Sequence, residues 1–138
     1  DLNTPGAGAA GGLGFALSVF LHAELTPGIE IVMEETQLEE KIKTADLVVT
    51  GEGRLDAQTA MGKAPVGVAK LTKKHHKPVI AFAGGIEKGA EACNKAGITA
   101  FFPAVRGVTT LEEAMRPEVA AENLAESAEQ VFRLLTLK

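Results

Sequence analysis

The stretch VVTGEGRLDAQTAMGKAP, residues 48–65, decides the fold that this sequence predicts. An apolar run over 47–50 is typical of a strand covered on both faces, and Pro65 can open a helix because its missing N–H costs nothing in the first helical turn. Between them lies a long loop of glycines, charges and amides. Ligands of open parallel sheets bind outside the carboxyl ends of the strands, so we expect this loop to form the functional site.

Two further apolar runs predict the rest of the sheet. PVIAFAGG (78–85) and ITAFF (98–102) indicate strands, with a helix from Pro65 before the first and a helix over 88–95 between them. Strands that alternate with helices are typical of a parallel sheet with right-handed crossovers. The predicted fold class is therefore α/β, a parallel sheet of three to four strands with helices on both faces, Rossmann-like or flavodoxin-like.

The flanking segments predict one more strand and several helices. Apolar residues alternate over 28–34, which is the period of a half-buried strand. Two threonines, each with a glutamate three residues later, have capping-box spacing and predict short helices, the first over 37–43: Thr36 with Glu39, and Thr110 with Glu113. A last helix begins at Pro117, and its apolar stripe should pack on the sheet: Leu124, Ala128, Val131 and Leu135.

Composition and charge limit the classes of function. The 138 residues are 46% apolar and 23% charged, which is ordinary for a soluble globular protein and predicts a single α/β domain over 1–138. A net charge of −4 lacks the positive field that binding to nucleic acid or an anionic membrane requires, so the expected partner is a small molecule. The single cysteine, Cys93, cannot form an internal disulfide and favours a reducing, cytoplasmic location.

The N-terminal stretch from Leu2 to Leu21 carries no charge and is long enough for a membrane span. Its many glycines make it a poor membrane helix, so a glycine-rich loop that leads into a buried helix over 13–24 is the better interpretation. Residues 1–5 begin without methionine and show no secretory signal, so we expect the chain to be part of a longer protein.

The same loop places Gly6, Gly8 and Gly11 in the G-x-G-x-x-G spacing of dinucleotide-binding folds. That motif requires a preceding strand, which the proline in residues 1–5 argues against, so the match alone is weak. A glycine-rich turn before a helix can still bind an anion through free backbone N–H groups, while close helix packing explains the glycines equally well.

The loop after the predicted strand over 47–50 supplies three kinds of groups that phosphoryl transfer uses. Cationic side chains can hold the moving phosphate, carboxylates can hold Mg²⁺ or accept a hydroxyl proton, and glycines allow close approach. The loop provides these groups in pairs: Arg54 and Lys63, Glu52 and Asp56, Gly51 and Gly53. The spacing does not match the Walker A motif G-x-x-x-x-G-K-S/T. The alternative is a solvated loop with surface ion pairs of ~0–1 kcal/mol each, which we place second because so long a polar loop has no evident packing purpose.

Four segments, in this order, resemble the C-terminal portion of the bacterial glycerate kinase family: GAGAAGGLGFAL (6–17), LTPGIEIV (25–32), ADLVVTGEGRLDAQTAMGKAPVGVAK (45–70) and KPVIAFAG (77–84). The resemblance runs through most of the chain, and TGEGRLDxQTxxGKxP is much more specific than any short phosphate motif. The PDSFKG and DGGEGT segments typical of the N-terminal part of these kinases have no counterpart in this sequence.

The resemblance implies an ATP-dependent kinase that requires magnesium and converts D-glycerate to a phosphoglycerate, expected to be 2-phosphoglycerate. It also implies two α/β domains with the site in the cleft between them. This chain would then be the C-terminal fragment, and its partner would be the remaining N-terminal part of the same kinase. Two alternatives stay open: a non-catalytic module that binds a small acid or phosphate, and an inactive fragment of the kinase.

The resemblance points to residues 50–63 and 6–12 as site segments. We expect Arg54 and Lys63 to bind the glycerate carboxylate or the transferred phosphoryl group, and Asp56 to accept the hydroxyl proton or hold Mg²⁺. Glu52 is an alternative metal ligand. Gln58 and Thr59 are expected to bind substrate hydroxyls, and the other substrate- or phosphate-binding positions are Thr50, Gly51, Gly53, Gly62, Gly6 and Gly8.

Overall fold

The computed structural model describes residues 6–137 and divides into two compact units, residues 1–38 and 39–138. The expected single domain over 1–138 stays a prediction. Residues 1–5, for which the sequence predicts no strand, lie outside the described residues.

The first unit begins with helix α1 (Ala9–Leu21), which is kinked near its start. At the kink, Gly11 and Gly12 have left-handed φ values of 68° and 96°. The chain before the helix packs closely on it, because a Cβ at Gly14 would lie 2.5 Å from the carbonyl oxygen of Gly6. Gly14 therefore allows a close backbone approach, whereas Gly11 and Gly12 adopt the left-handed backbone of the kink. No helix in the described part of the chain is both long enough and apolar enough to cross a bilayer.

The predicted strand over 28–34 is wrong, because these residues form helix α2 (Gly28–Glu35). Ile29 and Met33 are half-buried, whereas Ile31 between them is 48% exposed. A spacing of four puts two side chains on the same face of a helix, so the same apolar residues satisfy a helix as well as an alternating strand.

The predicted capping box at Thr36 and Glu39 is also wrong. The Thr36 hydroxyl donates to the Val32 carbonyl at 2.7 Å, so it satisfies the end of α2 instead of the start of the next helix. The next helix, α3 (Leu38–Thr44), agrees with the helix predicted over 37–43.

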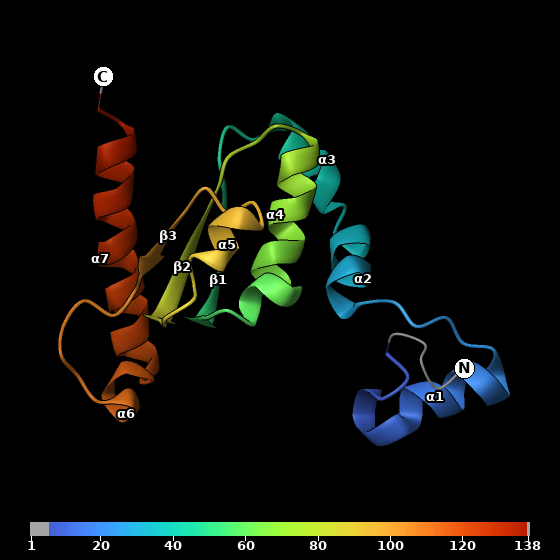
Figure 1. The fold of residues 1–138 in the computed structure, drawn as a ribbon. Coiled ribbons are helices and arrows are strands. Elements are labelled where there is room, and N and C mark those ends of the chain that lie inside the picture. The colour runs from blue at the N-terminus through green and yellow to red at the C-terminus, as the bar shows by residue number, and fades with distance from the viewer. Residues whose placement is uncertain (1–5, 138) are drawn as a thin grey trace. The chain divides into compact units, whose positions relative to one another are not determined.

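The second unit is built on three parallel strands, β1 (Val48–Leu55), β2 (Val79–Ile86) and β3 (Ala100–Pro103), in the order β1-β2-β3 (Figure 1). β1 is longer than predicted, because its pairing with β2 continues past the apolar run to Leu55 and Ile86. The TGEGR residues therefore belong to the strand and not to the loop that follows it.

Helices cover both faces of this sheet. Helices α4 (Ala64–Lys74) and α5 (Ala92–Lys95) lie on one face, and α7 (Pro117–Leu135) lies on the other (Figure 1). The short helix α6 (Leu111–Ala114) precedes α7, and Thr110 caps it as predicted, accepting a backbone hydrogen bond at 3.2 Å. Helix α5 is shorter than predicted, and the α/β fold class with helices on both faces is confirmed.

The main core lies between the sheet and the pair α4 and α5. It contains nine buried residues, among them Leu55 and Val66, which are fully buried. The core on the α7 face is smaller and contains the buried residues Ile80, Phe82 and Val131. Most of the apolar burial in the second unit is therefore on the α4 face.

The α7 face is less completely covered than the sequence predicts. Val49, expected on a strand covered on both faces, is 47% exposed. In the apolar stripe of α7, Val131 is buried and Ala128 packs beside it, but Leu124 and Leu135 are 45% and 53% exposed. The helix thus leaves part of the sheet uncovered.

Charged contacts tie α3 to the end of α4. The Glu39 carboxylate accepts a hydrogen bond from Lys74 Nζ at 2.7 Å and lies 2.7 Å from His75 Nε2. These contacts lower the pKa of Glu39 to about 2, with the Lys74 hydrogen bond as the largest cause and the His75 contact next. The Glu39 carboxylate therefore stays ionised down to strongly acidic pH.

Candidate functional site

The predicted polar loop begins later than expected, because β1 continues to Leu55. Residues 56–63 leave the sheet and include the one-turn helix η1 (Thr59–Met61). Lys63 is the N-cap residue of α4, and Pro65 lies in its first turn, as predicted. The loop thus joins the carboxyl end of a parallel strand to a helix N-terminus, which is where parallel sheets bind ligands and where helices favour anions.

Asp56 and Thr59 hold the turn that follows β1. The Thr59 N–H donates to Asp56 Oδ1 at 2.9 Å, and the Asp56 N–H donates to the Thr59 hydroxyl at 3.2 Å. The Thr59 hydroxyl in turn donates to Glu52 Oε1 at 2.7 Å. Because Thr59 is fully buried, its backbone N–H and its hydroxyl together connect the two carboxylates inside the protein.

Two cations face these carboxylates, and together the four side chains Glu52, Arg54, Asp56 and Lys63 form what we call the charge cluster. Lys63 Nζ lies 3.4 Å from Asp56 Oδ1 and 3.9 Å from Glu52 Oε1. Arg54 Nε lies 3.9 Å from Asp56 Oδ2, and Arg54 also donates to the Glu87 carboxylate at 3.2 Å. The Asp56 and Glu52 side chains are 14% and 18% exposed, against 63% for Arg54 and 42% for Lys63. An approaching anion therefore meets positive charge first.

The hydrogen bonds of Asp56 keep it ionised. The backbone N–H of Thr59 lowers the pKa of Asp56 most, and the Thr59 hydroxyl and the Lys63 charge lower it further, against a smaller opposing effect of burial. A carboxylate with a lowered pKa is a weak proton acceptor but a good ligand for a cation. Of the two roles expected for Asp56, this environment favours cation binding.

Glu52 and Asp56 are the carboxylates of this cluster that could hold Mg²⁺. In phosphoryl-transfer sites Mg²⁺ usually takes one or two carboxylates, with phosphate oxygens and waters as its other ligands. Thr59 and Lys63 engage one oxygen of each carboxylate. Within residues 6–137, no group of three or more His, Cys, Asp or Glu side chains gathers as a metal site. The donor set fits an ion that binds together with a phosphate.

Gln58 and Gly62 flank η1 and are exposed to solvent. Gly62 ends this helical turn with a left-handed φ of 119°, a conformation that favours glycine. Gly6 and Gly8 belong to the first unit, where Gly6 has a left-handed φ of 87° and Gly8 is the N-cap residue of α1. The anion site expected at these two glycines stays a prediction.

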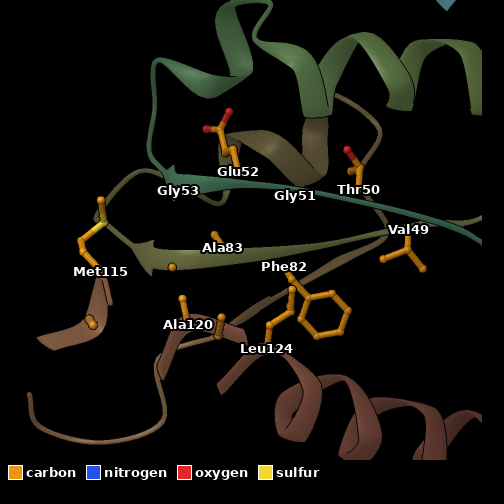
Figure 2. Close-up of a pocket in the computed structure, with 13 residues that line it drawn as sticks. Val49, Thr50, Gly51, Glu52, Gly53, Phe82, Ala83, Met115, Ala120 and Leu124 are labelled. Carbon is orange, nitrogen blue, oxygen red and sulfur yellow. The ribbon is translucent and has the colours of Figure 1, made fainter. Parts of the chain in front are cut away.

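A pocket of about 640 Å³ lies between the sheet and the helices α6 and α7. The predicted residues Thr50, Gly51 and Gly53 line it through β1. Figure 2 shows the side chains of Thr50 and Glu52 on the side of β1 away from Leu124, which reaches toward the sheet from α7. Strand residues alternate between faces, so β1 presents its carboxylate to the charge cluster and its glycines to the pocket.

Sequence reasoning missed two parts of this region. Glu87 reaches Arg54 because Leu55 and Ile86 are register partners, and its signal was its place at the carboxyl end of the second predicted strand. The apolar pocket was missed because the apolar stripe of α7 was expected to pack on the sheet, and Leu124 in that stripe stays 45% exposed. The sequence feature that could have indicated the pocket is the pair of glycines at positions 51 and 53, opposite an apolar helix.

The known proteins that this chain resembles belong to one family. The model of the glycerate kinase family matches residues 1–136. The chain is 51% identical over 126 residues to a glycerate kinase of Halalkalibacterium halodurans and 45% identical over 135 residues to the glycerate 2-kinase of Escherichia coli K12. These matches cover 88% and 98% of this chain, but only 33% and 35% of the two relatives.

A solved structure agrees with these matches. The glycerate kinase 2 chain of Salmonella typhimurium LT2 is 44% identical and has a TM-score of 0.71, over 94% of this chain and 32% of that chain. The chain thus spans about a third of the length of the curated relatives it matches. The resemblance seen in the TGEGR segment is confirmed, and the chain belongs to the glycerate kinase family.

Proposed function

We propose that the complete protein transfers the terminal phosphoryl group of ATP to D-glycerate, with 2-phosphoglycerate as the expected product. The charge cluster carries this proposal, because two exposed cations lie beside two shielded carboxylates at the carboxyl end of β1. Phosphoryl transfer depends mainly on positioning and charge stabilisation, which such a cluster supplies. The glycerate kinase names of the relatives support the choice of D-glycerate.

Each group of the cluster has a proposed role. Arg54 and Lys63 bind the glycerate carboxylate or the transferred phosphoryl group, helped by the dipole of α4, whose N-cap residue is Lys63. Asp56 and Glu52 hold Mg²⁺, which neutralises phosphate charge when it is bound. Gln58, exposed beside the cluster, binds a substrate hydroxyl. The Thr59 hydroxyl is engaged inside the protein, so we propose that Thr59 positions the carboxylates instead of touching the substrate.

The rest of the site is expected from the remaining part of the same kinase. The chain spans about a third of its curated relatives, so we propose that it is the C-terminal portion and that the other portion closes the cleft over the charge cluster. The free thiol of Cys93 and the use of ATP keep the cytoplasm as the expected location.

The test measures ATP consumption by the complete protein with and without D-glycerate. We expect consumption only with D-glycerate, and a loss of kcat/KM of about 100-fold or more in Asp56→Asn and in Lys63→Met. Asp46→Asn and Lys70→Met make the same changes at exposed residues of the second unit and should keep the wild-type value. Near-normal kcat/KM in both site variants contradicts the assignment. Phosphorus NMR of the product identifies the hydroxyl that is phosphorylated.

A second candidate function is a module that binds a small acid or phosphate without turnover. The exposure of both cations favours it, because anion binding at this cluster does not depend on a closed cleft. This function predicts that D-glycerate or phosphate raises the Tm of the complete protein while ATP is not consumed under any condition.

A further inference from the structure

We propose that the pocket between the sheet and α6–α7 binds the purine base of the phosphate donor. The proposal rests on the proposed kinase function, because that function requires a nucleotide. It assigns the base to the face of β1 opposite the charge cluster. The phosphate-binding roles predicted for Gly51 and Gly53 do not include binding of a base.

The floor of the pocket is bare backbone. Gly51 and Gly53 of β1 and Gly84 of β2 line it. The neighbouring strand requires glycine at two of these positions, because a Cβ at Gly51 or Gly84 would lie 2.5 Å or 2.7 Å from a backbone carbonyl oxygen. At Gly53 no atom lies within 4 Å of an added Cβ, so packing does not explain that glycine. The resulting flat strip suits a planar ring that lies against peptide groups.

The walls of the pocket are apolar and incompletely covered. Phe82 lies at the sheet side, while Leu124 and Met115 on the helix side are 45% and 70% exposed (Figure 2). The volume of about 640 Å³ lies inside the range of roughly 300–1,000 Å³ that small-molecule pockets occupy. Exposed apolar side chains around a hollow of this size are typical of binding grooves and of surfaces that another part of a protein covers.

The lining selects the base over the other parts of the substrates. Among the described residues that line the pocket, only Glu52 is charged, and its carboxylate is turned away and bonded to Thr59 (Figure 2). Glycerate and the triphosphate both need cations, which these walls do not provide. A purine is planar and can pack its faces against the ring of Phe82 and the sulfur of Met115.

The pocket and the charge cluster are connected along β1. Gly53 at the pocket and Asp56 in the cluster are three residues apart, which is roughly 10 Å along an extended chain. The ribose and phosphates of a nucleotide span a similar distance. A nucleotide with its base beside Gly53 can therefore pass the carboxyl end of β1 and place its terminal phosphate near Lys63.

The test fills the pocket from α7 in the complete protein. Ala120 lines the pocket, and its neighbour Ala121 is exposed on the same helix outside the lining, so Ala120→Phe and Ala121→Phe are a matched pair. We expect Ala120→Phe to raise the Kd of ATP and of adenosine by about tenfold or more, because both carry the base. The Kd of inorganic tripolyphosphate, which has no base, should not change. Ala121→Phe should leave all three constants at their wild-type values.

A second variant removes part of the wall instead of filling the pocket. Leu124→Ala acts at a side chain that is 45% exposed, so the fold should tolerate the substitution. It should also weaken the binding of ATP and adenosine but not the binding of tripolyphosphate. An unchanged Kd for adenosine in both Ala120→Phe and Leu124→Ala overturns the inference. A lower Tm of Ala120→Phe with unchanged nucleotide affinity also overturns it, because the pocket is then filled by another part of the complete protein.

Activity measurements separate the failure of this inference from the failure of the kinase proposal. Turnover of D-glycerate by Ala120→Phe with an unchanged KM for ATP contradicts the pocket assignment alone. Absence of turnover in the wild-type protein, together with an adenosine Kd that depends on residue 120, contradicts the kinase proposal and supports the base site.

Discussion

The two faces of the sheet differ in what fills them. On the α4 face, Leu55 and Val66 are fully buried, and the polar side chains near them are bonded to one another through Thr59. On the α7 face, glycines replace side chains along β1, and Leu124 remains 45% exposed above them. The first face is closed by the chain itself, while the second keeps room that the described residues do not fill.

This difference arises from the alternation of one strand. Residues 50, 52 and 54 of β1 carry a hydroxyl and two charges, while residues 51 and 53 are glycines. Because successive residues of a strand point to opposite faces, one short segment can supply a polar group to one side and bare backbone to the other. Stability and ligand room are therefore divided between the two faces of the sheet.

The largest expected effect is a difference between the two faces in how much a substitution lowers the free energy of unfolding. Leu55→Ala removes a fully buried side chain and leaves a cavity, so it should lower the free energy of unfolding by about 2–5 kcal/mol. Leu124→Ala makes the same change at a half-exposed side chain and should cost less than about 1 kcal/mol. Urea denaturation of the complete protein measures both losses. Equal losses would mean that the two faces are packed alike.

The next effect concerns the Thr59 hydroxyl, which donates to the Glu52 carboxylate on the α4 face. Thr59→Val keeps the shape but removes the hydrogen bond to Glu52, so kcat for D-glycerate should fall by about tenfold to a hundredfold with little change in KM. Thr59→Ser restores the hydroxyl and should recover most of the kcat. On the other face, Ser127→Ala removes a hydroxyl that donates to the Ala104 carbonyl and should leave kcat unchanged. Failure of Thr59→Ser to recover activity would contradict the positioning role.

The smallest effect concerns the charged contacts between α3 and the end of α4. The pKa of Glu39 is lowered from 4.5 to about 2 by the hydrogen bond from Lys74 and then by His75, so its contribution to stability is present above pH 4.5 and is lost as the pH falls toward 2. Glu39→Gln should therefore lower Tm slightly at pH 7, and the difference from wild type should shrink below pH 4.5. Glu122→Gln, at an exposed position of α7, should show no such difference. A difference that grows in acid would contradict the contact.

The elements with strong local signals were predictable from the sequence. The apolar run of β2 and the prolines that open α4 and α7 mark their elements without help from the rest of the fold. The extension of β1 to Leu55 was not predictable, because polar residues join a strand here through pairing with β2, and composition does not report that register. The helix α2 was missed because its apolar residues fit two periods at once.

The site was predictable as a place and as a set of charges. Arg54, Asp56 and Lys63 were expected within one loop. In the structure, Arg54 and Lys63 both lie within 4 Å of the Asp56 carboxylate. The division of roles was not predictable, because it depends on which side chains turn inward. Thr59 is fully buried although a polar loop residue is ordinarily expected to face solvent. Glu87 entered the site through the register of the two strands.

The buried thiol of Cys93 has a consequence for the timing of motion in the loop. Its Sγ lies 3.8 Å from the backbone carbonyl of Asp56, and burial, followed by the charges of Glu52 and Asp56, raises the pKa of the thiol. A thiol reagent can react only after the core around Cys93 has opened, which includes the contact between α5 and the Asp56 carbonyl, and only with the small fraction of thiolate present then. The rate at which Cys93 is labelled therefore reports how often α5 separates from this core and from the loop, in the native chain and without an attached probe.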